Sequence, residues 1–236
     1  MNADAEMAAL EKSLRRRFRV VENKVAVADG SVSLLHPASA EDLINEQDFE
    51  RDERLPYWAE IWPSSLVLAG LVMRMSGGGR RLIELGCGAG LVATCAARVG
   101  FDVTATDYYE DATRFARLNA WRNEGMTIAG VMVDWRSMPD QLGRYDTVLA
   151  SDVLYERPYG ELVAGAIAAV LAPGGIALVA DPGRVGRESF LSALTPQGLR
   201  VRSKNDIAYV NGAIRQTIAC FEVGWDSDGG PAGPVP

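Results

Sequence analysis

From Arg81 onward, short β-rich runs alternate with longer helical segments, and this order constrains the fold more than any other feature of the chain. Such alternation produces a parallel sheet covered by helices, so we predict an α/β fold with helices on both faces of the sheet. Near the end, Asn211-Gly212 favours a turn between two β-rich runs and predicts an antiparallel closing pair. The predicted strands are 81–86, 102–107, 128–133, 145–151, 175–180, 198–204 and 214–223, and the predicted helices are 91–99, 110–124, 159–171 and 187–194.

The chain of 236 residues has the length of one domain, and we assign residues 1–225 to it. Residues 1–60 form an N-terminal extension. Within it, Ala3 to Arg17 is predicted to be a helix, and two alternating runs around Asp29-Gly30, between Phe18 and Leu35, predict a β-hairpin flap. Residues 226–236 are acidic and rich in glycine and proline, so we predict a disordered tail.

A glycine-rich turn joins the first strand of the predicted sheet to its helix. Residues 82–91 read Leu-Ile-Glu-Leu-Gly-Cys-Gly-Ala-Gly-Leu. Backbone without Cβ atoms can approach a ligand closely, and the amides of the next helix point at that ligand. A dinucleotide-binding turn would need its third glycine at position 91, where Leu91 stands. The spacing therefore disfavours NAD and is similar to the turn of methyltransferases that use S-adenosylmethionine, although a plain tight turn has the same pattern.

Acidic residues mark the ends of four strands of the predicted sheet. Glu84, Asp107, Asp134 and Asp152 lie at or directly after these ends. Parallel strands bring their carboxyl ends to one edge, where ligands of open α/β sheets bind. We predict a pocket there, although acidic residues at such positions also cap the following helices.

Two residues of this edge suit an adenosine ligand. Asp107 lies 17 residues after Gly90, an offset at which a carboxylate can accept both ribose hydroxyls. Trp135 follows in a loop and can cover an adenine face, or it can belong to the core.

Several motifs together resemble the seven-strand protein-lysine methyltransferase family. The family includes eukaryotic modifiers of chaperones and elongation factors and bacterial enzymes that act on the electron-transfer flavoprotein β subunit. The resemblance spans Phe18 to Val223 and implies a Rossmann-like class I sheet of seven strands. The segment Asp181-Pro182-Gly183-Arg184 is similar to the bacterial members, whereas Pro63-Ser64 departs from the eukaryotic ones, so the substrate is not carried over. The motifs are Pro-Tyr-Trp-Ala-Glu-Ile-Trp-Pro-Ser-Ser from Pro56, the Glu84 to Leu91 turn, Thr106-Asp107, Asn119, Asp134-Trp135 and the run from Ala150 to Tyr155.

This resemblance, taken with the strand-end pattern, implies an S-adenosylmethionine site whose product is S-adenosylhomocysteine. Asp152 and Tyr155 match a D-x-x-Y element on the methyl-acceptor side and are the predicted catalytic residues. The predicted cofactor-binding residues are Trp62, Glu84, Gly86, Cys87, Gly88, Gly90, Asp107, Tyr108, Asp134, Trp135 and Ser151.

Methyl transfer to an amine is mainly a positioning problem, because a neutral nitrogen must reach the methyl carbon in line. Our hypothesis is that Asp152 recruits and orients the amine, Tyr155 shapes the slot and water accepts the proton. The acceptor is expected to be a lysine of a protein, with a small amine or other metabolite as the alternative. A second alternative is a cofactor-binding module without turnover.

Composition excludes several other classes of function. The single histidine, His36, disfavours a Ser-His-Asp mechanism or a histidine-rich metal site, and Cys87 is expected to be a small lining residue rather than a nucleophile. A net charge of −7 argues against broad nucleic-acid affinity. The acidic stretch from Glu41 to Glu60 either attracts a cationic substrate or forms an exposed helix face, and Arg15 to Arg19 is a solvated helix end. With no leader and no membrane span in the sequence, we expect a cytoplasmic protein of open oligomeric state.

Overall fold

The structure, a computed structural model, describes residues 2–28, 30–40, 43 and 56–226. The predicted acidic stretch therefore lies largely outside the described residues, as does the tail beyond residue 226. Among the described residues, no helix combines the length and the apolar character needed to cross a bilayer.

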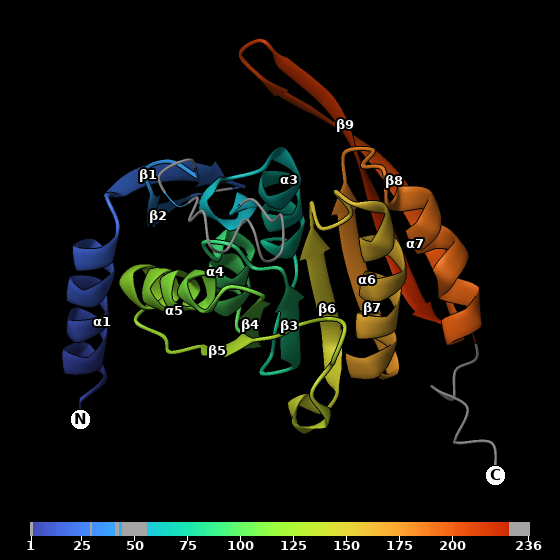
Figure 1. Ribbon diagram of the computed structural model, residues 1–236, viewed down its shortest axis with the longest axis horizontal. Helices are drawn as coiled ribbons and strands as arrows, with labels where there is room; N and C mark the ends of the chain where they lie inside the picture. Colours follow the sequence, from blue (N-terminus) through green and yellow to red (C-terminus); the bar gives the residue numbers. More distant parts are fainter. Residues whose placement is uncertain (1, 29, 41–42, 44–55, 227–236) are drawn as a thin grey trace.

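A seven-stranded sheet with the order β5-β4-β3-β6-β7-β9-β8 forms the centre of the described fold (Figure 1). The first five strands in this order are parallel, whereas β9 runs antiparallel to both of its neighbours. The α/β prediction is confirmed, including the antiparallel last strand. The strands are β3 (Arg81–Leu85), β4 (Asp102–Asp107), β5 (Ala129–Met132), β6 (Tyr145–Ser151), β7 (Leu171–Asp181), β8 (Leu199–Asn211) and β9 (Ile214–Trp225).

Helices cover both faces of this sheet, and each face has its own apolar core. On one face, α3 (Pro63–Val72), α4 (Leu91–Arg98) and α5 (Glu110–Glu124) pack beside the hairpin. On the other face, α6 (Arg157–Val170) and α7 (Arg187–Leu194) pack against β6 and β7. Three short 3₁₀ helices, 57–59, 140–142 and 195–197, complete the described elements.

The N-terminal segment folds as predicted into a helix and a hairpin. Helix α1 (Ala3–Arg17) packs on α5, and Arg17 forms a bidentate ion pair with Asp111. Strands β1 (Val20–Val27) and β2 (Gly30–Pro37) form a separate two-stranded sheet.

Two asparagines of α5 anchor the hairpin to the body of the molecule. The side chain of Asn119 bonds both the N–H and the C=O of Leu35, and Asn123 does the same for Ser33. Each amide thus replaces a neighbouring strand for one residue of β2. The hairpin is therefore a fixed wall beside α4 and α5.

The closing hairpin is longer than its sequence predicts. β8 was expected to end near residue 204, but it continues to Asn211, and its register with β9 extends to the Asn211–Ile214 pair. Residues 204–206, Lys-Asn-Asp, have low β propensity, which is why the pattern fails there. Backbone pairing with β9 overrides that local preference.

Replacing Gly90 with alanine is expected to destabilise the fold. Gly90 has φ +83°, and a Cβ there would lie 2.4 Å from Ala116 Cα, so α4 could no longer approach α5. Backbone strain and overpacking together cost about 3 kcal/mol, or roughly 10 °C in melting temperature. Thermal unfolding followed by circular dichroism measures this change.

Gly100→Ala is the matched control, because Gly100 has a similar φ of +88° and the nearest atom to its Cβ would be 3.7 Å away. It carries the backbone strain without the clash. Equal losses in both variants would contradict the role of the α4–α5 contact.

Candidate active site

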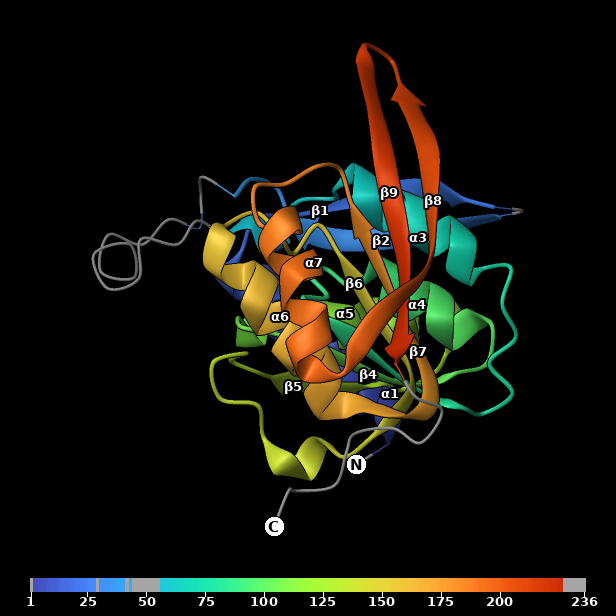
Figure 2. The same cartoon turned by 90° about the vertical axis from the view of Figure 1, so that its right-hand side faces the viewer.

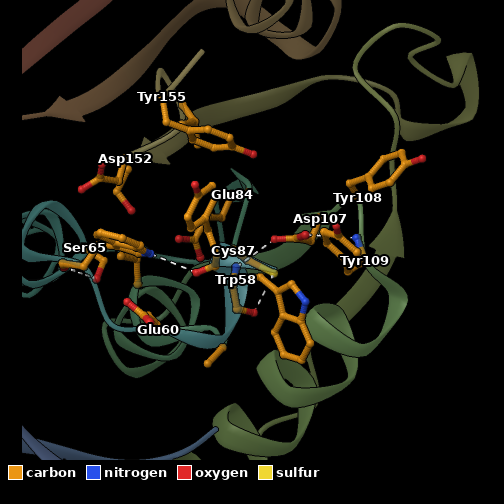
Figure 3. Close-up of a pocket in the computed structure, with 18 of the residues that line it drawn as sticks. Trp58, Glu60, Ser65, Glu84, Cys87, Asp107, Tyr108, Tyr109, Asp152 and Tyr155 are labelled. Atoms are coloured by element: carbon orange, nitrogen blue, oxygen red, sulfur yellow. Dashed lines mark hydrogen bonds between the residues drawn. The ribbon is translucent and has the colours of Figure 1, made fainter. Parts of the chain in front are cut away.

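A cavity of about 1100 Å³, part of it open to solvent, lies at the carboxyl edge of the sheet. All of the predicted site residues except Gly90 line it. Figure 3 shows Asp107 and Tyr108 on one side of this cavity and Asp152 and Tyr155 on the other, with Cys87 between them. The strand topology thus gathers residues that lie far apart in sequence.

Gly90 was predicted to bind the cofactor, but it is not among the lining residues. It is the N-cap of α4 and packs against Ala116, as described above. Its glycine identity is explained by helix packing. In the structure Gly90 therefore allows α4 to pack closely against α5.

The other two glycines of the turn form a cradle that side chains would fill. A Cβ at Gly86, which has φ +71°, would lie 2.9 Å from Val153 Cγ1 and 3.5 Å from the Trp135 ring. A Cβ at Gly88, with φ +51°, would lie 3.0 Å from the carbonyl oxygen of Trp58. Any larger residue at either position would distort the turn and take up space in the cavity.

Asp107 ends β4 and is tied to the glycine turn. Its Oδ2 accepts a hydrogen bond of 3.0 Å from the Gly88 N–H, and its Oδ1 accepts one of 3.1 Å from the Tyr109 N–H. Burial raises the pKa of this carboxyl to about 6, although these backbone donors oppose the rise. Each carboxylate oxygen can accept further donors, such as two adjacent hydroxyl groups.

The affinity for S-adenosylmethionine is expected to depend on the ionisation of Asp107. A carboxylate binds ribose hydroxyls more strongly than a neutral acid does, so binding favours the ionised form. With a pKa of about 6, affinity is expected to be constant above about pH 7. Below pH 6 it should fall by up to about tenfold per pH unit, because a proton must first be released. Calorimetry with S-adenosylhomocysteine across this range measures the effect.

Asp107→Asn supplies the control, because its side chain does not titrate. The fall in affinity on acidification should disappear in this variant. A persisting fall would assign the titration to another group, and Glu84 would be the next residue to test.

Glu84 is buried beneath the turn on β3. Burial raises its pKa well above the usual value, with the nearby Asp107 charge adding to the rise and a hydrogen bond from the Ala93 backbone opposing it. Its Oε2 has no hydrogen-bond partner among the described residues. A buried oxygen without a partner is costly. As a carbonyl it would accept from a donor on a bound molecule, and as the hydroxyl of the neutral acid it would donate to an acceptor there.

Cys87 and Trp135 line the same part of the cavity. Burial raises the pKa of the Cys87 thiol well above its usual value, as do the charges of Asp107 and Glu84, so the thiol stays protonated. The Trp135 ring lies beside Gly86, and its buried Nε1 finds no acceptor in the described part of the chain. The rings of Trp135 and Tyr159 form an edge-to-face contact, with centroids 6.0 Å apart.

Two residues at the rim share one arginine. Arg136 is paired with Asp134 at 2.6 Å, and its guanidinium lies 5.9 Å from the centre of the Tyr108 ring. Tyr108 and Asp134 therefore border the cavity near Asp107. Ser151 ends β6 at the opposite wall.

Asp152 has an unusual backbone conformation that its sequence does not reveal. Its φ is +58°, in the left-handed region that non-glycine residues seldom adopt, and its N–H donates to the Ala180 carbonyl of β7. Strained residues of this kind are frequent at functional sites. In this conformation Asp152 lines the cavity.

The Asp152 carboxylate has one paired oxygen and one unpaired oxygen. Arg184 Nε donates to Oδ1 at 2.5 Å, and its guanidinium also lies 5.1 Å from the centre of the Trp62 ring. The buried Oδ2 has no partner among the described residues. Arg184 was noted in the sequence only as part of a motif, and its ion pair with Asp152 was not predicted.

Buried Asp181 holds this arginine in place. Its carboxylate accepts hydrogen bonds from the N–H groups of Gly183 and Arg184 and from Arg187 Nε at 2.6 Å. The segment that follows β7 is therefore folded around one carboxylate. Its effect is to present Arg184 to Asp152.

An aromatic wall covers the side of the cavity that Tyr155 lines. Tyr155 packs against Tyr159 and Tyr57 with centroid distances of 4.8 and 5.3 Å, and Tyr57 packs against Trp62 at 6.0 Å. Burial, followed by the proximity of Tyr159, raises the pKa of the Tyr155 phenol, which therefore stays protonated and is no base near neutral pH.

Several lining residues were not predicted. Tyr57, Trp58 and Glu60 lie in the motif before Trp62, which was singled out alone, and their presence in that motif was the available signal. Tyr109, Glu156 and Tyr159 also line the cavity. The last two begin the helix after Tyr155, and nothing in their sequence spacing distinguishes them from ordinary helix residues.

His36 lies outside the cavity. Its ring bonds Asn23 and the carbonyl groups of Pro37 and Ala59, so it ties β2 to β1 and to the 57–59 turn. No group of three or more His, Cys, Asp or Glu side chains that could hold a metal ion occurs in the described ranges.

Residues 64–207 match the model of a family described as a methyltransferase domain, which is more than half of the chain. The chain belongs to this methyltransferase domain family. With its seven-stranded sheet and antiparallel last strand, it is a class I S-adenosylmethionine-dependent methyltransferase. The finer prediction of a protein-lysine methyltransferase is not part of this match.

Solved methyltransferase structures have the same fold. Magnesium protoporphyrin IX methyltransferase from Synechocystis PCC 6803, with bound S-adenosylhomocysteine, matches with a TM-score of 0.54 and 16% identity, covering 77% of this chain and 96% of that one. The ribosomal protein L11 methylase from Lactobacillus delbrueckii subsp. bulgaricus matches with a TM-score of 0.51 and 20% identity, covering 67% and 77%. At these identities the likeness concerns the fold.

Curated relatives match over about half of their length. The ubiquinone biosynthesis O-methyltransferase of Bordetella avium is 34% identical over 122 residues, 49% of this chain and 48% of the relative. The protein of the same name from Xanthomonas euvesicatoria is 32% identical over 140 residues, 53% of this chain and 56% of the relative. The chain thus spans about half the length of these relatives.

The cavity fits S-adenosylmethionine on observations of its own. The cradle of Gly86 and Gly88 leaves room for a ligand against bare backbone, and Asp107 offers paired oxygens to a ribose. Glu84 Oε2 and Trp135 Nε1 are buried polar atoms that still need partners. When bound, the cofactor supplies an electrophilic methyl group on a sulfonium.

Proposed function

We propose that this methyltransferase transfers the methyl group to an amine nitrogen, and that the amine is a lysine side chain of a protein. The observation that carries this proposal is the Asp152 carboxylate, with Oδ1 on Arg184 and Oδ2 buried and unpartnered at the cavity wall. An N–H donor on the acceptor would satisfy that oxygen. We assign the other lining residues roles on the cofactor side and on the acceptor side.

On the cofactor side, we assign Asp107 to the ribose and Trp135 to the adenine, with Tyr108 and Asp134 at the rim. The amide cradle of Gly86, Cys87 and Gly88 would border the methionine part, together with Trp62, Glu84 and Ser151. These assignments rest on the cavity geometry and on the resemblance of the motifs.

On the acceptor side, Asp152 would orient the amine while the aromatic wall excludes water. An amine has a pKa of about 10.4 in water, so it must lose a proton before it can attack. Apolar surroundings favour the neutral form, whereas a lone carboxylate would favour the ammonium. Arg184 neutralises much of the Asp152 charge. Asp152 can therefore orient the amine with little increase in the pKa of the amine. The proton passes to water.

A small-molecule acceptor is the second candidate. The names of the curated relatives, ubiquinone biosynthesis O-methyltransferases, favour it. O-methylation of a hydroxyl group needs a base to remove its proton, and the acidic residues of the cavity lining are the candidates, since the lining contains no histidine. Because the chain covers only about half of these relatives, their acceptor is not carried over to it.

Incubation of the purified protein with methyl-labelled S-adenosylmethionine and a lysate of its source cells separates these candidates. Label in protein that appears as methyl-lysine after acid hydrolysis supports the first. Label confined to the low-mass fraction supports the second and excludes the first. Failure of the folded protein to bind S-adenosylhomocysteine would contradict both.

A further inference from the structure

The closing hairpin projects beyond the rest of the sheet. β9 pairs with β7 only from Ala219 to Val223, but its pairing with β8 continues from Ile218–Ile207 to Ile214–Asn211. We call residues 207–218 the arm. At about 3.3 Å per residue, it extends roughly 16 Å past β7. Figures 1 and 2 both show it standing clear of the body of the molecule.

The arm is apolar on surfaces that face solvent. Val210 is 57% exposed and Ile214 is 48% exposed, and they lie on opposite faces of the ribbon beside the turn, because Val210 is paired with Arg215 and Ile214 with Asn211. Only its base is packed, where Ile207 and Tyr209 contact the core cluster that includes residues of α3. A two-stranded ribbon has little stability of its own in water, so an arm of this kind is best explained by a partner that covers it.

The hairpin also differs in charge from the rest of the chain. The closing hairpin, residues 199–225, contains four basic residues, Arg200, Arg202, Lys204 and Arg215, and two acidic residues, Asp206 and Glu222. Lys204 is paired with Asp206 at 2.9 Å. The whole chain has 24 basic and 31 acidic residues, so the remainder has 20 and 29, a net charge of −9 against +2 for the hairpin. A basic ribbon on an acidic protein attracts an acidic partner and repels a basic one.

The hairpin is also placed beside the active site. It rises from the carboxyl edge of the sheet, since β9 begins at the end where β7 finishes. Helix α3 connects the two regions, because Ser65 in its first turn lines the cavity and its residues Val67 and Leu71 pack in the cluster that Ile207 joins. A molecule bound to the arm would therefore lie next to the acceptor side, whereas Arg200 and Arg202 lie toward the opposite edge of the sheet.

From these observations we propose that the arm and the edge strand β8 bind an acidic surface of the protein that carries the methyl acceptor. This inference rests on the proposed function, and the partner is the methylated protein, recognised by its acidic surface. Among the described strands, β8 lies at the edge of the sheet and offers backbone N–H and C=O groups to an extended segment of the partner. The basic side chains of the hairpin favour a segment with acidic side chains.

The test compares two double variants with the same change in charge. Lys204→Glu with Arg215→Glu reverses the exposed charge of the hairpin. Lys12→Glu with Arg16→Glu does the same on exposed positions of α1, at the opposite end of the molecule (Figure 1). Each protein is given labelled S-adenosylmethionine and a lysate of its source cells, and S-adenosylhomocysteine affinity and melting temperature are measured in parallel.

The hairpin variant should label protein at least tenfold more slowly at limiting lysate, with cofactor affinity unchanged and the α1 variant within twofold of wild type. Added salt should slow the wild type and have little effect on the hairpin variant. Val210→Ser with Ile214→Ser should reduce labelling as well. Equal labelling by the hairpin variant and wild type overturns the inference. Label found in nucleic acid or only in small molecules removes the proposed function as well, because the acceptor is then not a protein lysine. Loss of cofactor binding in the wild type would likewise remove the proposed function.

Discussion

Asp107→Ala is expected to weaken S-adenosylmethionine binding by roughly 100-fold. The substitution removes an anionic acceptor for ribose hydroxyls, and hydrogen bonds to charged groups contribute about 1.5 to 3 kcal/mol each. It also frees the Gly88 N–H, which Asp107 holds at 3.0 Å, so the glycine turn loses an anchor. A net loss near 3 kcal/mol corresponds to that affinity change. Isothermal titration with S-adenosylhomocysteine measures it.

Asp102→Asn is the control for this variant, because Asp102 lies exposed at the opposite end of the same strand. It should bind the cofactor like the wild type. Circular dichroism and the melting temperature establish that both variants are folded. If folded Asp107→Ala keeps wild-type affinity, the ribose lies elsewhere and the assignment of the cavity is wrong.

Asp152→Asn is expected to lower the rate of methyl transfer about 100-fold and to leave cofactor affinity within a few fold. Asparagine tolerates the left-handed backbone that Asp152 adopts at φ +58°, so the local fold should survive. The amide replaces the carboxylate that Arg184 holds and changes the acceptor oxygen offered to the amine. A small misplacement of the attacking atom costs about 100-fold in rate. Single-turnover labelling of the acceptor measures the rate.

Asp140→Asn serves as the control, because Asp140 lies exposed in the 3₁₀ turn before β6. It should transfer methyl groups at the wild-type rate. A large loss of cofactor binding by Asp152→Asn would instead reassign Asp152 to the cofactor side. Full activity of that variant would remove the carboxylate from the mechanism.

Much of the fold could be predicted from local sequence, because strand and helix periods and glycine positions are local properties. The order of elements after Arg81, the Asn211-Gly212 turn and the N-terminal hairpin were predicted in this way, and the structure has them. The length of β8 was not predicted, because its outer half depends on pairing with β9 and not on its own composition. Strand propensity is weak compared with such pairing.

For the candidate site, sequence predicted which residues the sheet edge collects, because parallel strands bring their ends together. The sequence could not distinguish a glycine that lines the cavity from a glycine that allows two helices to pack closely. Gly86 lines the cavity, whereas Gly90 packs against Ala116. The sequence also could not reveal the ion pair between Asp152 and Arg184, which joins the ends of two different strands.

The chain's own pattern thus determined an α/β methyltransferase sheet with an acidic, glycine-lined edge, since these features follow from residues close together in sequence. Only the tertiary structure decided that Asp152 is paired with Arg184 and adopts a left-handed backbone, and how far the closing hairpin extends past the sheet. Both depend on contacts between segments distant in the chain, whose energies no local pattern records.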